Sequence, residues 1–397
     1  MRKLAINGGK PTRDVFLPFS KPTIGKEEIR SVTGVLKSGW LTMGAKVKEF
    51  EDNFKNYVGS EYAIAVQSCT FALHLSLVCI GVESGDEVIT TPFTFAATAN
   101  VIVWERAKPV FVDIDPESYN ITPDMIEEKI TEKTKAIIPV HFAGQPCDMD
   151  PILRIARKHD LRLIEDAAHA TGSTYNGRKI GTIGDVTCFS FYPTKNITTG
   201  EGGIMTTNDA KVAEKTEMLR LHGMDKSAWK RYSRKGSWYY QIKYAGYKYN
   251  MTDIQAALGI EQLKKLDKFN QKRIELARYY SQKFENISEI ATPKDKGLGK
   301  HVYHLYPIQV RTDNLKIDRD RFIQALKAEN IGTSVHFIPL HLHPFYQKSF
   351  GYRSGDFPVA EETYRNIVSL PLFPKMNKED VDDVVVAIEK ILRASRK

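Results

Sequence analysis

The sequence predicts an α/β protein: a large part built on a mainly parallel sheet flanked by helices, followed by a smaller C-terminal α+β part. Between residues 62 and 207, apolar runs of strand length alternate with amphipathic runs of helical length, which is typical of parallel sheets covered by helices. The chain has 397 residues, more than a single hydrophobic core usually serves. After residue 300, strand-like and helix-like runs follow one another in blocks, as they do in small α+β units.

The first part of the chain is predicted to be an arm followed by two helices. Residues 1–25 are rich in Gly and Pro and are expected to be extended. Apolar residues recur at helical spacing from Lys26 to Gly39, and again from Val47 to Tyr57. The turn between these helices contains Trp40 and Leu41, which are interpreted either as a plain half-buried turn or as part of a pocket.

The large part is predicted to cover residues 26–267 and the smaller part residues 268–397. In the large part, strands are expected at residues 62–67, 87–91, 109–114, 136–140, 161–165, 186–191 and 204–207. Helices are expected there at residues 70–80, 93–105, 123–130, 149–159 and 209–221, and Thr252 is expected to cap a long helix that leads out. In the smaller part, strands are expected at residues 302–310 and 333–337, and helices at residues 318–329, 360–367 and 378–392.

Composition and charge narrow the function classes. The formal net charge is +9, but acidic and basic residues alternate over most of the length, so an anionic small substrate explains the excess better than nucleic acid does. No apolar run reaches the roughly 18 residues that span a bilayer, and the N-terminus lacks a signal-peptide core. The four cysteines are scattered, which favours free thiols in a reducing compartment. We therefore expect a cytoplasmic protein with no membrane partner.

Lys195 and Asp166 are the strongest candidates for chemistry. Lys195 lies in a Gly- and Thr-rich turn between two predicted strands; burial there would lower its pKa and leave a nucleophilic amine suited to Schiff-base chemistry. Asp166 ends an earlier strand, at the edge where open parallel sheets bind ligands. Pyridoxal phosphate requires a lysine for its aldehyde and an acid that keeps its pyridine nitrogen protonated. A loop lysine near a structural acid is the alternative interpretation.

The sequence resembles a known family in two stretches, SFYPTKNITTGEGG around Lys195 and EDAAHA from Glu165. Both are similar to motifs of the DegT/DnrJ/EryC1/StrS sugar aminotransferases, which belong to fold-type I of the pyridoxal-phosphate enzymes. The similarity extends from about Leu17 to the C-terminus. It implies a sheet of the seven-stranded type, bound pyridoxal 5'-phosphate and catalysis by Lys195 and Asp166. One branch of the family has histidine in place of the lysine and dehydrates sugars, so Lys195 implies an aminotransferase.

The resemblance also implies which residues bind the cofactor: Ser68, Cys69, Thr70, Phe95, Asp166, His169, Ser190, Lys195 and Asn250. Ser68, Cys69 and Thr70 precede or open a predicted helix, where backbone N–H groups and hydroxyls suit a phosphate. The family's usual form there is closer to S-G-T-A-A-L, so Cys69 and Phe71 depart from it. A capped helix, without a ligand, is the alternative interpretation.

Two further side chains are assigned to the cofactor ring and one to a partner's cofactor. Phe95 is expected to stack on the pyridine ring, and His169 to contact the phenolic oxygen; ordinary core packing is the alternative for both. The family uses the residue equivalent to Asn250 to bind the phosphate of the neighbouring subunit's cofactor. The resemblance thus implies a homodimer with shared active sites.

The residues expected to bind substrate are Trp40, Leu41, Arg231, Arg234 and His336. The two arginines lie in residues 226–249, a segment without Asp or Glu in which basic and aromatic residues alternate. Arginine binds phosphates bidentately and aromatic faces stack on bases, so a keto sugar linked to a nucleotide diphosphate is the expected substrate. Glutamate is the amino donor that the resemblance implies.

Other functions stay open. The nearest is amination of a carbocyclic ketone, a cyclitol, by the same chemistry. A non-catalytic pyridoxal-phosphate-binding regulatory protein and a desulfurase are further alternatives, but the chain shows neither a DNA-binding appendage nor a cysteine in a Gly-rich loop. The histidines of HFIPLHLHP from His336 are interrupted by Pro339 and have no cysteine near them, so no metal is expected.

Overall fold

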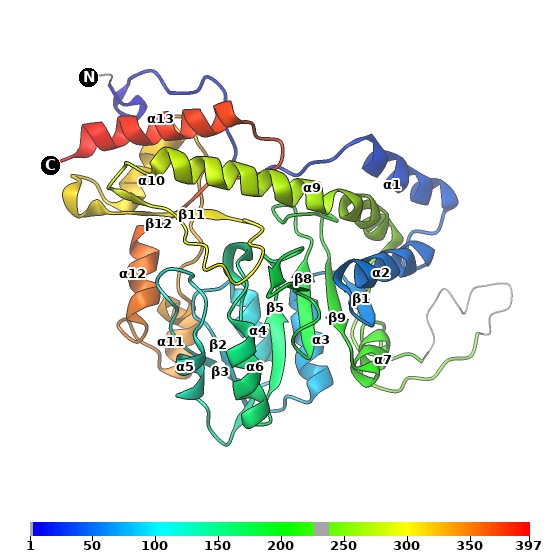
Figure 1. The fold of residues 1–397 in the computed structure, drawn as a ribbon. Helices are drawn as coiled ribbons and strands as arrows, with labels where there is room; N and C mark the ends of the chain where they lie inside the picture. The colour runs from blue at the N-terminus through cyan, green and yellow to red at the C-terminus, as the bar shows by residue number, and fades with distance from the viewer. Residues whose placement is uncertain (1–2, 226–237) are drawn as a thin grey trace.

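The computed structural model describes residues 3–225 and 238–397. Its large sheet consists of β1 (Tyr62–Val66), β2 (Glu87–Thr90), β3 (Lys108–Phe111), β4 (Thr134–Ile137), β5 (Arg162–Asp166), β8 (Val186–Ser190) and β9 (Gly203–Thr207). The strand order is β1-β9-β8-β5-β4-β2-β3, and β9 alone in this sheet runs antiparallel to its neighbours. The predicted mainly parallel α/β sheet is confirmed (Figure 1).

Helices flank this sheet on both faces. They are α1 (Lys26–Ser38), α2 (Ala45–Val58), α3 (Cys69–Ile80), α4 (Ala96–Trp104), α5 (Pro123–Glu127), α6 (Met149–Lys158), α7 (Ala210–Leu219) and α9 (Asp253–Phe284). Successive residues of a strand point to opposite faces: Ala63 and Ala65 of β1 pack in the core beneath α2, α6 and α9, while Ile64 and Val66 pack in the core beneath α3, α4 and α7. Both faces are buried, which explains the near-continuous apolar runs of these strands.

The helix boundaries follow from local capping. The Ser68 side chain accepts a hydrogen bond from the Phe71 N–H and so caps α3. Thr252 and Gln255 form the expected capping box of α9, and α1 ends at Gly39 in the left-handed conformation. Figure 1 shows α9 crossing the end of the large sheet, from α1 and α2 toward the C-terminal elements.

The C-terminal elements form a second, antiparallel sheet with its own core. The sheet has the order β10 (Ile290–Ala291), β11 (Tyr306–Val310), β12 (Ile367–Leu370). Around it lie α10 (Arg319–Ala328), α11 (Pro344–Phe350), α12 (Pro358–Asn366) and α13 (Lys378–Ser395). Residues of the N-terminal arm join this core: Leu4 and Leu17 are buried in it, and Leu17 pairs with Ile331. The α+β character is as predicted; the boundary at residue 268, inside α9, stays a prediction.

Short elements complete the described residues. The two-stranded sheet of β6 (Thr174–Tyr175) and β7 (Arg178–Lys179) follows β5. Four single-turn helices are η1 (Ala5–Asn7), η2 (Phe142–Gly144), η3 (Thr312–Asn314) and η4 (Leu340–Leu342).

The strand predicted at residues 333–337 is wrong. Only Ser334 pairs there, by exchanging backbone hydrogen bonds of 3.1 and 2.8 Å with Ser369 of β12. Val335 and Phe337 instead pack against an apolar cluster that joins loops of the large sheet to α11 and α12. The alternation of apolar residues therefore reflects packing against this cluster. The strand position is taken by β12, where the helical pattern of residues 360–367 breaks because Ile367 is extended.

Candidate active site

The sheet register brings the predicted phosphate-binding residues together. Gly203 of β9 lies opposite Val66 on one side and Ser190 on the other. Ser68 follows Val66 by two residues, and Val66 also pairs with Asn250. The turn before α3, the end of β8 and the start of α9 therefore meet at one edge of the sheet.

Gly203 is required by this close approach. A Cβ atom there would lie 2.4 Å from the Cys69 nitrogen and 2.4 Å from the Ser68 carbonyl carbon, distances that real Cβ atoms do not show. Because Gly203 has none, β9 can pack directly against the first turn of α3. The Cys69 and Thr70 N–H groups at the start of this helix, together with the Ser68, Thr70 and Ser190 hydroxyls, have the donor chemistry that a phosphate needs.

Phe71 and Cys69 depart from the family pattern without opening the turn. The Phe71 ring stacks on Tyr249 at 3.7 Å with an interplanar angle of 3°, and the Tyr249 carbonyl accepts the Gln67 N–H at 2.9 Å. The aromatic pair fastens the start of α3 to the segment that contains Asn250. Burial raises the pKa of the Cys69 thiol well above its usual value, so the thiol stays neutral.

Asp166 ends β5 in a buried position. One carboxylate oxygen accepts the Thr98 hydroxyl at 2.7 Å, and the other accepts the Ala168 N–H at 3.1 Å. Each oxygen keeps further lone-pair capacity for a ligand donor. Burial raises the pKa of this carboxyl, while the nearby Lys195 ammonium lowers it. A cationic ring nitrogen would therefore be a favourable partner here.

Lys195 lies after β8 and is partly buried. Its backbone N–H donates to the Tyr192 carbonyl at 2.9 Å, which closes a turn. Burial lowers the pKa of its ammonium to about 8, and the Asp166 carboxylate opposes this shift. The predicted lysine and acid thus lie close enough for the charge of each to shift the pKa of the other, and the lowered pKa of Lys195 suits a lysine that forms a covalent link to an aldehyde.

His169 is a buried, neutral hydrogen-bond donor. The Ala143 N–H donates to its Nδ1 at 3.3 Å, so the ring proton is on Nε2. Burial, and then the Lys195 charge, lower its pKa well below the usual value. His304 lies against it, with ring centroids 4.4 Å apart.

Phe95 and His336 are also placed near this cluster. Phe95 is 65% exposed and its ring centroid lies 6.3 Å from that of Phe337, whereas Phe93 is fully buried. Phe95 is therefore not a core residue. His336 pairs with the Ser369 hydroxyl at 2.9 Å, and burial, followed by Lys195, lowers its pKa to about 3. The ring centroids of Phe337 and His169 lie 6.0 Å apart. Phe337 was not predicted to lie near the site, because its alternating pattern indicated a strand.

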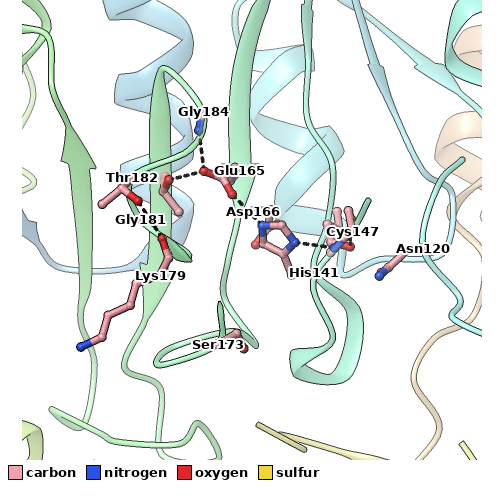
Figure 2. Close-up of polar contacts among 12 residues, drawn as sticks. Asn120, His141, Cys147, Glu165, Asp166, Ser173, Lys179, Gly181, Thr182 and Gly184 are labelled. Atoms are coloured by element: carbon pink, nitrogen blue, oxygen red, sulfur yellow. Dashed lines mark hydrogen bonds and ion pairs between the residues drawn. The ribbon is translucent and has the colours of Figure 1, made fainter. Parts of the chain in front are cut away.

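A buried network of hydrogen bonds surrounds Glu165, the β5 residue that precedes Asp166. Figure 2 shows His141 lying between Glu165 and Cys147. The Cys147 N–H donates to His141 Nδ1 at 3.0 Å, so Nε2 carries the proton that it donates to Glu165 at 2.9 Å. Gly184 and Thr187 also donate to Glu165, and these bonds lower its pKa despite burial. No local sequence pattern indicates this pairing, since the two residues are 24 positions apart.

The predicted substrate loop is tied to α9. Asp253 accepts the Gly44 N–H at 2.8 Å and the Val47 N–H at 3.0 Å, and so caps α2, which has no side-chain cap of its own. This fixes the loop containing Trp40, whose indole N–H donates to the Met43 carbonyl at 3.3 Å. Leu41 in the same loop is exposed.

The structure does not test the predicted roles of Arg231, Arg234 and Asn250. Arg231 and Arg234 lie outside the described residues. Asn250 is buried, accepts the Lys248 amine at 2.6 Å and lies at the same sheet edge as Ser68 of its own chain. Its predicted role at a partner's cofactor stays a prediction.

Within residues 3–225 and 238–397, no His, Cys, Asp or Glu side chains are grouped in threes so that they could hold a metal ion. Of the histidines in residues 336–343, His341 is buried, and its Nε2 lies 2.9 Å from a Glu361 carboxylate oxygen.

The helices within residues 3–225 and 238–397 include none with the length and apolar character needed to cross a membrane.

The residues present fit pyridoxal phosphate. The α3 turn offers donors for a phosphate, Asp166 offers a buried carboxylate, Lys195 offers an amine of lowered pKa, and His169 offers a free Nε2–H donor. Sequence comparison agrees: the profile of the DegT/DnrJ/EryC1/StrS aminotransferase family matches residues 22–389.

Among curated proteins, similarity extends over whole chains. The chain is 60% identical over 384 residues to the uncharacterised protein MJ1066 of Methanocaldococcus jannaschii, covering 97% of this chain and 100% of that protein. It is 53% identical to the spore coat polysaccharide biosynthesis protein SpsC of Bacillus subtilis, covering 96% and 99%.

Solved structures share the fold. PseC of Helicobacter pylori, an aminotransferase involved in pseudoaminic acid biosynthesis, has a TM-score of 0.88 at 32% identity and covers 96% of this chain and 100% of its own. The putative sugar aminotransferase Spr1654 of Streptococcus pneumoniae in its PMP form has a TM-score of 0.89 at 36% identity, covering 95% and 99%; it is also known in a PLP form.

Proposed function

Because the chain belongs to the DegT/DnrJ/EryC1/StrS aminotransferase family, we propose that it aminates a keto sugar attached to a nucleotide diphosphate, with glutamate as amino donor. As a member of this family it is a pyridoxal-phosphate-dependent aminotransferase. The observation that carries the sugar assignment is the end-to-end 53% identity with a polysaccharide biosynthesis protein. The likeness to PseC and to a putative sugar aminotransferase supports it.

The cofactor supplies an aldehyde that takes up the amino group and a ring that accepts charge from the substrate carbon. We assign the covalent link to Lys195. With a pKa of about 8, its amine is partly neutral near neutral pH, so it can attack the aldehyde. When it is not linked to the cofactor, the same amine would serve as the base that holds and moves a proton at the donor's α-carbon.

Asp166 and His169 are assigned to the ring. The Asp166 carboxylate, oriented by Thr98, holds a proton on the pyridine nitrogen. His169 presents Nε2–H because its Nδ1 is occupied by the Ala143 N–H, so it donates to the phenolic oxygen. Phe95 covers one ring face and excludes water from it.

The phosphate is assigned to Ser68, Cys69 and Thr70 at the start of α3 and to the Ser190 hydroxyl. The Cys69 contribution is its backbone N–H, because its thiol is buried and neutral. Because Gly203 lets β9 pack closely against the start of α3, the donors of the α3 turn and the Ser190 hydroxyl lie at the same edge of the sheet.

The substrate is assigned to two regions. Trp40 and Leu41 of the α1–α2 loop and His336 near Lys195 would contact the sugar. Arg231 and Arg234 would bind the diphosphate, since residues 226–249 contain seven basic residues and no acid. We further propose a homodimer in which Asn250 reaches the partner's cofactor phosphate, and a cytoplasmic location, which the four free cysteines favour.

A panel of keto sugar nucleotides, assayed with glutamate, tests the substrate. We expect Arg231→Glu or Arg234→Glu to raise KM for the sugar nucleotide, more strongly at low salt, and to leave the half-reaction with glutamate within about twofold. Lys211→Glu, on the exposed start of α7, is the matched control and should change neither.

The competing substrate is a carbocyclic ketone, which carries no nucleotide. It would be favoured by efficient amination of a free cyclitol ketone, or by equal loss in both half-reactions of the arginine variants. Either result would contradict the nucleotide-sugar assignment without affecting the assignment of Lys195.

A further inference from the structure

One face of α9 is buried and carries polar side chains that bond to the active-site loops. Gly259, Gln262, Leu266, Asn270 and Arg273 recur at spacings of three and four, so they lie on one stripe of the helix. All five are buried. A stripe of this kind is normally apolar, so its polar members need an explanation.

The first members of the stripe contact the loop after Lys195. A Cβ atom on Gly259 would lie 2.9 Å from the Thr199 methyl carbon, so the helix and the loop are in direct contact. Gln262 accepts the Thr198 N–H at 3.3 Å and donates to the Thr23 carbonyl at 2.8 Å. The helix therefore supplies partners for loop backbone groups that sheet and helix ladders do not satisfy.

Asn270 is the centre of this arrangement. It is fully buried, accepts the Asn196 side-chain N–H at 2.6 Å and donates to the Thr171 carbonyl at 3.0 Å. The Thr171 carbonyl fixes which end of the amide is the donor, so the Asn270 oxygen faces Asn196. Gly172 leaves room for it: a Cβ there would lie 2.5 Å from the Asn270 nitrogen.

The two partners of Asn270 belong to the two catalytic segments. Asn196 directly follows Lys195, and Thr171 follows His169 by two residues and Asp166 by five. One buried amide thus spans the loop that carries the lysine and the turn that carries the acid. Arg273, one turn further along, donates to the carbonyl of His304 at 3.2 Å, the residue that packs on His169.

We propose that Asn270 is a positioning residue for Lys195. Through Asn196 it fixes the loop that holds the lysine, and through Thr171 it fixes that loop relative to Asp166 and His169. This role rests on the proposed function in one respect, that Lys195 is the cofactor lysine. It matters because misplacing a reacting group by about 1 Å can cost about a hundredfold in rate.

The test begins with wild-type holoenzyme. Borohydride reduction and peptide mapping should place the cofactor on Lys195; an adduct on another lysine would overturn the proposed function and this inference with it. If the adduct is on Lys195, the remaining measurements test Asn270 alone.

Asn270→Leu keeps the branched shape of the side chain, with methyl groups in place of the amide oxygen and nitrogen, and removes both hydrogen bonds. We expect the half-reaction with glutamate to slow by about tenfold or more, with KM for glutamate within about twofold. The pH midpoint of the bound cofactor's visible absorbance should shift by about half a unit or more, a change that lost stability alone would not produce. A wild-type rate and an unshifted midpoint would overturn the inference.

Matched variants identify the link. Gln271→Leu, one position along, should behave as wild type, because the Gln271 side chain is exposed and donates to Glu275 on the surface at 3.0 Å. Asn196→Leu should reproduce the slowing seen in Asn270→Leu, and the double variant should lose no more than the worse single variant, because both variants remove the Asn196–Asn270 bond. Multiplying losses would show independent effects and overturn the inference. If Asn270→Leu does not fold, Asn196→Ser removes the same link from the loop side and decides by the same measurements.

Discussion

At the scale of single residues, burial sets the ionisation of the two groups assigned to the chemistry, the Asp166 carboxyl and the Lys195 amine. The Asp166 carboxyl has its pKa raised by burial and is held by Thr98 and the Ala168 N–H. The Lys195 ammonium has its pKa lowered to about 8 by the same cause. A cationic cofactor ring would favour the ionised form of the Asp166 carboxyl. The cofactor aldehyde would react with the neutral form of the Lys195 amine.

Asp166→Asn should leave the fold intact and slow turnover by about a hundredfold or more. The amide keeps the acceptor for Thr98 but cannot hold the ring proton, and a preorganised charge in a buried site is typically worth several kcal/mol. Turnover and the melting temperature of the same preparation are the measurements. Near-normal turnover with an unchanged melting temperature would contradict the assignment of Asp166 to the ring nitrogen.

Lys195→Met should stabilise the cofactor-free protein in a pH-dependent way. The pKa of Lys195 is about 8 in the folded chain and ordinarily about 10.4 when unfolded. Below the folded value both states hold the proton, so the full cost of burying an ammonium is present; as pH rises toward the unfolded value, the folded state has released its proton and the cost is relieved.

The expected gain in the free energy of unfolding is on the order of 1–3 kcal/mol at about pH 7, and smaller at about pH 9.5. Urea unfolding of both proteins at the two pH values measures it. The same gain at both values would mean that Lys195 is not the source of the pH dependence.

At the scale of elements, side chains of α9 bond to the loops that carry the predicted site residues. Its first residue, Asp253, caps α2 and fixes the predicted substrate loop. Further along, Gln262 and Asn270 bond to the loop after Lys195. The same helix continues into the C-terminal core through Leu276 and Tyr280. Loops that come from distant parts of the sequence are thereby fixed to one rigid element.

Asp253→Asn tests the first of these contacts. The amide retains one acceptor but loses the charge that favours a helix N-terminus, so we expect the protein to lose about 1–2 kcal/mol of stability. KM for the keto sugar should rise, because the loop of Trp40 and Leu41 is less fixed, while the glutamate half-reaction stays within about twofold. Asp267→Asn, further along the same helix, is the matched control. Unchanged KM despite the lost stability would remove this loop from the substrate site.

Elements with local signals were predictable from the sequence. Ser68 and Thr252 cap helices through their own side chains, so the starts of α3 and α9 followed from residue type. Asp166 was identified because a strand end is a local feature. The site candidates at Ser190 and Lys195 came from the motif, and the pairing of Ser190 with Gly203, which lies against Ser68, explains why Ser190 is near the α3 turn.

Features that depend on distant partners were not predictable. Polar residues such as Asn270 on a helix normally indicate a solvated face, and only the structure shows which loop they bond to. The strand expected at residues 333–337 failed because its alternation serves packing of Val335 and Phe337 instead of sheet pairing. The His141–Glu165 pair joins the loop after β4 to the end of β5, and no local pattern connects the two.

At the scale of the whole molecule, the proposed homodimer predicts complementation. If Asn250 serves the partner's site, inactive Lys195→Ala and Asn250→Ala chains should regain activity when mixed, because each mixed dimer has one site with both residues intact. Exchange of subunits, shown by labelled chains, is the control. No recovery despite exchange would contradict shared sites and leave Asn250 as a residue of its own chain's sheet edge.

The central claim is that Lys195 forms the covalent link to pyridoxal phosphate next to Asp166. Borohydride reduction of the purified holoenzyme followed by mass mapping of its peptides tests it directly. The account predicts one modified peptide, with the mass of the reduced cofactor on Lys195, and no covalent adduct in Lys195→Ala. An adduct on any other lysine, or the same adduct yield in Lys195→Ala, would contradict it.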